Sequence, residues 1–474
     1  MIPAWPLVTG AVPAVAVGAG GVALAGLVWG RGRGRGWWTR RLPLVVVAVA
    51  VAAGTAATVV DRVWRPFPEG LPTATPWWVG VPTLALALAV IRPPTRIPGN
   101  RSKPTGRSVR ARVSGPAAAS AAVLVVVLAT AVQVNAYFGA YPTLASALGA
   151  SPPNQVAFID VTGPPGRAVP MVGATGGRAL AQVWHPPPGM PAGGVISEVA
   201  IPAPTSGFAA RPGWVYLPPA YLATPRAQLP VLVLVSGQPG TSRDWLDGGK
   251  LSEVMDRFAR AHDGLAPVVV MPDTLGRSLA NPLCLDSRLG RAETYLAVDV
   301  PRWIRTRLLV DADPRAWAVA GFSQGGTCAL QMAVRAPEVY PTFVDISGQQ
   351  APTLGDPART AAAAFGGDPT ALARVDPLTV LGHTRYPRTA AVIVAGREDT
   401  TYRPQQQRVL AAVRAAGMDA RWVELPGGHT WRVWGPGLEQ SLPWLADRVG
   451  LTGPAPSPPS IPTGRPPGPM GPAR

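Results

Sequence analysis

The stretch Trp317-Ala-Val-Ala-Gly-Phe-Ser-Gln-Gly-Gly326 decides the fold of this chain. An apolar run leads into the pattern Gly-x-Ser-x-Gly, and a helical pattern follows from Gly325 to Ala336. A strand, a sharp turn and a helix in this order are typical of a nucleophile elbow, in which the serine projects over the edge of a sheet. We therefore predict Ser323 as a nucleophile. The alternative is an ordinary turn between a strand and a helix, because the chain is rich in glycine.

Short apolar runs alternate with helical patterns on both sides of this stretch. The expected strands are Val231–Val235, Val268–Met271, Trp317–Ala320, Thr342–Ile346, Ala390–Ala395 and Arg421–Leu425, with Gly194–Ile201 and Trp214–Leu217 as an antiparallel lead-in. The expected helices include Lys250–His262, Gly325–Ala336 and Gln405–Ala416. Continuous apolar strands separated by helices predict an α/β domain over residues 191–450, with a mostly parallel sheet covered on both faces.

A serine nucleophile needs a base, and the base needs a carboxylate that orients it. His429 lies in a glycine-rich loop directly after the last expected strand, where it can reach the elbow. Asp399 follows the strand before that one, and the chain order Ser323, Asp399, His429 is that of α/β-hydrolases. Glu398, next to Asp399, and Asp345, at the end of an earlier strand, are alternative acids.

Acyl chemistry also needs hydrogen-bond donors for a developing oxyanion. The backbone N–H of Gln324, directly after the serine, is one candidate. The second donor is expected in the loop Ser236-Gly-Gln-Pro-Gly240. Pro239 has no N–H, so Gln238 is the preferred donor and Gly237 the alternative.

The first quarter of the chain differs sharply in composition from the rest. Hydrophobic residues make up 47% of the chain and charged residues 15%, and the net charge is +17. Residues 1–133 carry +12 of that charge, between four apolar runs. Each run approaches the 20 or so residues that cross a bilayer, so we predict an all-α membrane domain. The four expected spans are residues 7–29, 42–60, 74–91 and 115–134.

The charged connections predict the orientation of these spans. The first and third connections are strongly basic, whereas the second, near residues 61–69, has Arg62 and Arg65 balanced by Asp61 and Glu69. Short basic loops stay in the cytoplasm, so the chain after the fourth span is expected to be extracytoplasmic in a multi-pass protein of the cell membrane. The lipid bilayer is thus a predicted partner. Nucleic acid is not a predicted partner, because most of the basic charge lies outside the folded domain.

Two alternatives concern the apolar runs themselves. The first run is also compatible with a cleaved signal peptide, although the usual basic start is missing. The four spans are also compatible with a transporter, although no ionisable residue lies in the middle of any span. We interpret them as an anchor.

Several further features qualify this interpretation. Residues 135–190 are expected to be a linker, and the proline-rich residues 451–474 a disordered tail. Cys284 and Cys328 enclose about 45 residues and are expected to form a disulfide outside the cytoplasm; two buried thiols are the alternative. Trp245, Trp431 and Trp434 could line a substrate groove or belong to the core. The four histidines and two cysteines form no metal-binding motif, so no metal or cofactor is expected.

Residues 190–450 resemble the esterase D-like (Putative esterase) family of α/β-hydrolases, which includes mycolyltransferases and S-formylglutathione hydrolases. The resemblance is carried by the following segments: Ile201-Pro-Ala-Pro-Thr-Ser-Gly-Phe, Val215-Tyr-Leu-Pro-Pro-Ala-Tyr221, Gly237-Gln-Pro-Gly240 with Asp244-Trp245, Gly321-Phe-Ser-Gln-Gly-Gly326 and Gly427-Gly-His-Thr-Trp-Arg-Val-Trp434. It implies Ser323 as nucleophile, His429 as base, an acid at Asp399 or Glu398, and the backbone of Gln238 and Gln324 as oxyanion hole. Ser236 departs from the family, where many members have His or Asp.

The expected protein is therefore a membrane-anchored serine esterase or acyltransferase that acts on an acyl ester of a lipid or of a cell-envelope glycolipid. Water as acceptor would make it an esterase, and a sugar or lipid acceptor would make it a transferase. A non-catalytic surface binding protein on a hydrolase scaffold is the alternative, against which the complete set of serine, histidine and acid argues.

Overall fold

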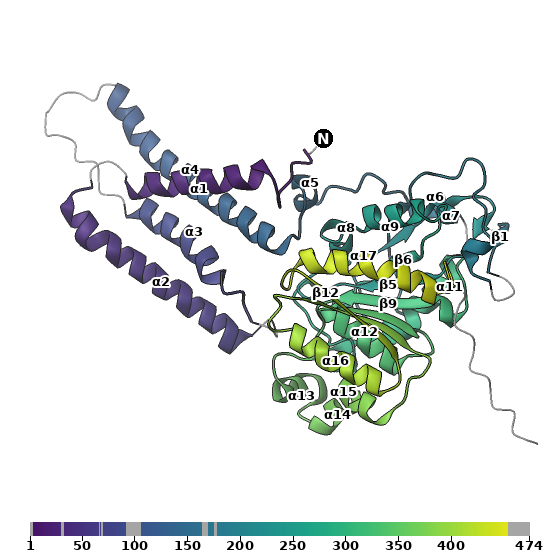
Figure 1. The fold of residues 1–474 in the computed structure, drawn as a ribbon. Coiled ribbons are helices and arrows are strands. Elements are labelled where there is room, and N and C mark those ends of the chain that lie inside the picture. The colour runs from purple at the N-terminus through teal and green to yellow at the C-terminus, as the bar shows by residue number, and fades with distance from the viewer. Residues whose placement is uncertain are drawn as a thin grey trace, which may run out of the picture.

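A computed structural model describes residues 3–29, 33–65, 67, 70–91, 106–163, 169–174 and 178–453, with residues 106–115 described as backbone only. An α/β domain lies beside a group of long apolar helices (Figure 1). The eight-stranded sheet has the order β12-β11-β10-β9-β5-β6-β3-β2. The strands, in that order, are Asp419–Leu425, Ala390–Gly396, Thr342–Ile346, Trp317–Phe322, Val231–Val235, Val268–Met271, Gly213–Leu217 and Val195–Val199.

The sheet is parallel from β12 to β6, and β3 joins β6 antiparallel with β2 antiparallel to β3. The central strands are apolar throughout because both of their faces are covered. Every residue of β5, β9, β10 and β11 is buried. The predicted mostly parallel sheet with an antiparallel edge is confirmed, and the elements fall within a few residues of their expected bounds.

Helices cover the two faces of the sheet (Figure 1). On one face, α9 (Leu251–Arg260) packs against α17 (Trp431–Arg448), and α17 lies over β9 to β12. On the other face lie α12 (Gln324–Arg335), α15 (Pro377–His383) and α16 (Arg403–Ala415). Helix α9 buries one stripe of apolar side chains: Leu251, Val254, Met255, Phe258 and Ala259.

The remaining elements of the domain are short. The helices are α7 (Pro219–Leu222), α8 (Asp244–Asp247), α10 (Ala292–Thr294), α11 (Val300–Arg307), α13 (Pro357–Phe365) and α14 (Pro369–Val375). Two small two-stranded sheets pair β1 (Met171–Val172) with β4 (Arg226–Ala227), and β7 (Asp286–Ser287) with β8 (Gly290–Arg291). Helices α13, α14 and α15 follow β10 and form a cap, called the cap helices below, beside α16 (Figure 1).

The predicted apolar runs all form helices. These are α1 (Ala11–Val28), α2 (Leu42–Val59) with short π-helical turns at both ends, α3 (Thr75–Val90) and α4 (Gly106–Phe138). Within the described residues, three segments are long and apolar enough to cross a membrane, namely Ala11–Val28, Trp37–Trp64 and Pro116–Phe138. The expected count of four is therefore not met. Helix α3 has 16 residues, a rise of roughly 24 Å, which is shorter than a hydrocarbon core of about 30 Å.

One end of this helical group packs against the α/β domain. Arg65, directly after the π-helical end of α2, forms an ion pair of 2.8 Å with Asp356 and donates to the carbonyl of Gly355. The Arg359 guanidinium donates to the carbonyl of Trp64 at 2.9 Å. Asp61 accepts from the Leu71 N–H at 2.7 Å and thus shapes the turn from α2 to α3.

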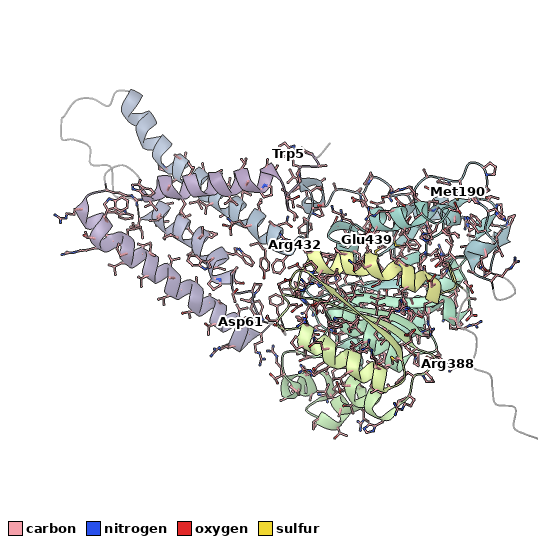
Figure 2. All side chains as sticks on the ribbon, viewed as in Figure 1. Trp5, Asp61, Met190, Arg388, Arg432 and Glu439 are labelled. Atoms are coloured by element: carbon pink, nitrogen blue, oxygen red, sulfur yellow. A yellow bond between two sulfur atoms is a disulfide. The ribbon has the colours of Figure 1, made fainter. Side chains whose placement is uncertain are left out.

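A second contact lies at the end of α4. The Arg432 guanidinium donates to the carbonyl of Ala136 at 3.3 Å. Figure 2 shows Arg432 on the side of the α/β domain that faces the long helices, and Asp61 at the end of those helices nearest the domain. A Cβ added to Gly139 would lie 3.4 Å from the Cβ of Trp431. The first residue of α17 is therefore in contact with the chain that leaves α4.

The segment predicted as a linker, residues 135–190, is in part packed against the α/β domain. It contains the short helices α5 (Leu144–Ala147) and α6 (Phe158–Thr162). Leu180 and Trp184 are 1% and 3% exposed, and the Leu180 N–H donates to the carbonyl of Gly450. A few large apolar side chains without periodicity are enough to hold such a segment, but they produce no recognisable pattern in the sequence. Of the predicted tail, residues 454–474 lie outside the described residues.

The disulfide between Cys284 and Cys328 links the loop after β6 to α12, as predicted. Replacing both cysteines by serine should lower the free energy of unfolding by about 4 kcal/mol, because the bridge closes a loop of about 45 residues in the unfolded chain. Urea denaturation of the full chain in detergent, followed by tryptophan fluorescence, measures this loss. A reducing agent should lower the midpoint of the wild type and leave that of the double variant unchanged; equal wild-type midpoints with and without it would contradict the prediction.

Candidate active site

The turn between β9 and α12 has the geometry of an elbow. Ser323 lies between the two elements with φ 54° and ψ −124°, a strained conformation for a residue with a side chain. A Cβ on Gly321 would lie 2.1 Å from the carbonyl oxygen of Gly325, and a Cβ on Gly325 would lie 2.3 Å from that of Val235. Both positions therefore require glycine, which is the physical reason for the Gly-x-Ser-x-Gly pattern.

The structure brings the predicted serine, histidine and acid together. His429 Nε2 lies 2.9 Å from Ser323 Oγ, and His429 Nδ1 lies 2.9 Å from Asp399 Oδ2. Asp399 follows β11 and is 4% exposed, whereas the His429 side chain is 21% exposed. The arrangement can move a proton from the hydroxyl to the imidazole while the buried carboxylate holds the ring in one orientation.

The two alternative acids have other contacts. Glu398 and Gly427 are joined twice, because the carboxylate of Glu398 accepts from the Gly427 N–H and the Glu398 N–H donates to the Gly427 carbonyl. Glu398 thus supports the loop that carries the histidine. Asp345 is fully buried and accepts hydrogen bonds of 3.0 Å from the Gly348 N–H and from Gln406 Nε2. Asp399 is the carboxylate within hydrogen-bond distance of His429.

Tyr402 is a part of the site that the sequence did not indicate. Its ring stacks on the His429 ring with centroids 4.0 Å apart and an angle of 14° between the planes. Its N–H donates to Asp399 Oδ1 at 2.9 Å, so one residue positions both the acid and the base. The spacing of three residues from Asp399 is the only sequence feature that links them, and such spacings are common in turns.

The loop after β5 borders the serine. A Cβ on Gly237 would lie 3.0 Å from the Ser323 Cβ, so the backbone passes close to the hydroxyl. Gln238 follows directly, and its side chain donates to the Leu279 carbonyl at 2.9 Å. Gln324 is the first residue of α12, where backbone N–H groups have no acceptor within the helix. Of the two residues predicted for the oxyanion hole, Gln324 thus follows the serine in the chain, and Gln238 follows the glycine whose backbone passes close to it.

An ion pair and several hydrogen bonds that could not be predicted from the sequence support this loop. Arg211 pairs with Asp273 at 2.7 Å and donates to the Gly240 carbonyl at 2.9 Å. Asp244 accepts from the N–H and the hydroxyl of Thr241 at 3.0 and 2.9 Å. Burial raises the pKa of Asp244 to about 6. These contacts fix both ends of the turn that follows Gly237.

Of the two alternatives left open for the three tryptophans, a substrate groove or the core, their burial favours the core. Trp245 is completely buried, and its indole N–H donates to the Val235 carbonyl at 3.2 Å. Trp431 and Trp434 are each 7% exposed and pack on Phe322, the residue before Ser323. The rings of Trp431 and Trp434 cover the Phe322 ring with apolar surface and so support the elbow that follows it.

The remaining side chains near the elbow give no sign of a metal site. Within the described residues, no group of three or more His, Cys, Asp or Glu side chains could hold a metal ion. The Gln324 amide lies 3.4 Å from Cys328 Sγ and 3.5 Å from Cys284 Sγ, so the disulfide packs against the first turn of α12.

Residues 210–445 match the family model described as Putative esterase. An uncharacterized protein of Corynebacterium glutamicum is 33% identical over 402 residues, or 84% of this chain and 87% of that protein. Among solved structures, a ferulic acid esterase is 22% identical (TM-score 0.46; 53% of this chain and 96% of that one). S-formylglutathione hydrolase of Agrobacterium tumefaciens is also 22% identical (TM-score 0.46; 55% and 97%).

The buried Asp345 carboxyl group should make the stability of the folded protein depend on pH. Burial raises its pKa to about 7, so between about pH 4 and pH 7 the folded protein holds a proton that the unfolded chain has lost. Stability should therefore fall as the pH rises through this window. In Asp345→Asn this contribution is absent, and the fall should be smaller. Thermal unfolding of both proteins from pH 4 to pH 8 measures the difference, and parallel curves would contradict it.

Proposed function

Because the chain belongs to the Putative esterase family, we propose that it is a membrane-anchored, extracytoplasmic serine enzyme that cleaves acyl esters through Ser323, Asp399 and His429. Membership of the family makes it an α/β enzyme that acts on esters. The proposal adds the catalytic residues, the covalent route and the side of the membrane. The observation that carries it is the continuous chain of two 2.9 Å contacts from Asp399 through His429 to Ser323.

The proposed reaction has two halves that share one base. Ser323 Oγ attacks the acyl carbon while His429 Nε2 accepts the hydroxyl proton, and Asp399 stabilises the resulting imidazolium. The oxyanion receives hydrogen bonds from the backbone N–H groups of Gln238 and Gln324. The tetrahedral intermediate then collapses, the ester bond breaks, and His429 returns the proton to the leaving alcohol. An acyl-enzyme remains on Ser323.

In the second half, a new hydroxyl group attacks the acyl-enzyme. His429 accepts its proton, and Ser323 leaves with a proton returned from the imidazolium, which restores the free enzyme. If water attacks, the product is a carboxylic acid and the enzyme is an esterase. If the hydroxyl of a sugar or lipid attacks, the acyl group is transferred. We propose a lipid or a cell-envelope glycolipid as the acyl donor, because the catalytic domain is attached to long apolar helices.

The acceptor can be tested directly. The full chain in detergent should release p-nitrophenol from p-nitrophenyl esters, and addition of trehalose or another sugar should yield an acylated sugar if the enzyme is a transferase. Mass spectrometry of the products separates the two outcomes.

The side of the membrane on which the catalytic domain lies can be tested with a reporter fused after residue 453. Activity of a phosphatase that folds only outside the cytoplasm supports the proposed orientation, and absence of this activity contradicts it.

Active-site labelling tests the nucleophile. A fluorophosphonate probe should label the wild-type chain, because it reacts with a serine that a neighbouring base activates. Ser323→Ala should abolish both the labelling and the ester hydrolysis. If the probe does not label the wild-type chain, the result would instead support a non-catalytic binding protein on this scaffold.

Exchanging the two neighbouring acids tests the assignment of the carboxylate. Asp399→Asn should lower kcat by a factor on the order of 10⁴, because the amide favours the wrong tautomer of His429. Glu398→Gln keeps an oxygen that can accept from the Gly427 N–H, so its kcat should fall less than tenfold. Steady-state kinetics with one soluble ester compares the variants, and circular dichroism confirms that both are folded. A larger loss in Glu398→Gln would reverse the assignment.

A further inference from the structure

A large cavity beside the proposed triad has no role in the mechanism described so far. Its volume is about 940 Å³, and it lies between the cap helices, the loop after β10 and the start of α16. This volume is within the range of small-molecule sites in proteins. Its walls include Ala358 and Ala361 of α13, Leu372 and Ala373 of α14, and Gln349 and Tyr402 on the side of the triad.

The inner wall is formed by residues that contact the catalytic groups. Tyr402 stacks on the His429 ring with centroids 4.0 Å apart. The Gln349 N–H donates to the Thr327 hydroxyl at 2.8 Å, and the Thr327 N–H donates to the Ser323 carbonyl at 3.1 Å. Tyr402 thus borders both the cavity and the His429 ring, which places the cavity next to the proposed triad.

The polar groups of the cavity are largely paired with one another. Arg408 Nε donates to the Gln350 side-chain oxygen at 2.6 Å, and the Gln350 N–H donates to Gln405 at 3.2 Å. Asp376 accepts from both the N–H and the hydroxyl of Thr379, at 2.8 and 2.6 Å. A sugar would have to replace these bonds, whereas an alkyl chain needs only the small apolar side chains that line the cap helices. The lining therefore favours an apolar ligand.

The outer rim of the cavity is joined to the end of a predicted span. Gly355 and Asp356 belong to the lining, and Arg65 binds both of them. Arg65 directly follows the segment Trp37–Trp64, which is long and apolar enough to cross a membrane. Trp64 is 60% exposed, and tryptophan is favoured at the interface between bilayer and water. The rim is thus placed near the interface between bilayer and water, where the ester end of a lipid lies.

We propose that this cavity binds the alkyl chain of a lipid ester taken from the bilayer in which the N-terminal helices lie. The inference rests on the proposed function, and it adds the substrate class and the entry route. The chain passes the rim at Arg65 and Asp356 and lies against the cap helices, while its ester reaches Ser323. Binding gains from apolar surface removed from water, so activity should rise with chain length until the cavity is filled.

The test fills the cavity without changing the triad. Ala358→Phe and Ala373→Trp place large rings in the cavity from positions that are exposed on the protein surface, so folding should tolerate them. Ala362→Phe, exposed on α13 and outside the lining, is the matched control. The full-length proteins in detergent micelles are assayed with p-nitrophenyl butyrate and p-nitrophenyl palmitate.

The two cavity variants should lose at least tenfold in kcat/KM for the palmitate ester and remain within twofold of wild type for the butyrate ester. Ala362→Phe should match the wild type with both esters. Equal losses for the two esters, or no loss for either, would overturn the cavity proposal while leaving the catalytic one intact. A wild type that hydrolyses neither ester would overturn both proposals.

The source of the lipid is tested in phosphatidylcholine vesicles. The protein is reconstituted either in vesicles that contain p-nitrophenyl palmitate or in plain vesicles mixed with separate ester-containing ones. Entry from the protein's own bilayer predicts hydrolysis at least tenfold faster when protein and ester share a vesicle. Equal rates in the two arrangements would show that the ester arrives through water and would overturn the proposed route.

Discussion

The close approach of helix α12 to the sheet is the constraint on which the rest of the site depends. The backbone of Gly325 lies so near to Val235 that a Cβ would meet its carbonyl oxygen at 2.3 Å. The same packing holds Ser323 at the tip of the turn, where its N–H donates to the Ile346 carbonyl at 2.8 Å. Three neighbouring strands thus fix one residue, and the strain at Ser323 is maintained by the buried sheet around it.

The histidine and its acid reach this point from the other half of the sheet. β11 and β12 end side by side, so the loops that carry Asp399 and His429 leave the same edge of the sheet. Tyr402 then connects them, because its N–H binds the acid and its ring covers the base. The helical group packs on this side of the domain as well, through Arg65 and Arg432. The apolar helices are therefore in contact with the side of the domain that carries the candidate site.

Much of the fold could be predicted because its features are local. The strands are continuous apolar runs, and the elbow is a short pattern whose glycines are required by close backbone contacts. The sequence favoured Asp399 but left Glu398 and Asp345 open, since Glu398 and Asp399 follow β11 and Asp345 lies at the end of β10 in the same sheet. Whether Trp245 lines a groove or belongs to the core could not be decided from the sequence for a related reason: the burial of a tryptophan depends on helices that arrive from distant parts of the chain.

The sequence by itself determined the order of the elements, the position of the elbow at Ser323 and the presence of long apolar helices, because hydrophobic periodicity and glycine requirements act over a few residues. Only the tertiary structure decided which carboxylate faces His429, that Tyr402 stacks on it, and that a cavity lies between the cap helices and the end of α2. These features depend on residues that are far apart in the chain or that lie in loops. Which partner such a side chain contacts is decided by how the packed helices and strands orient the loop.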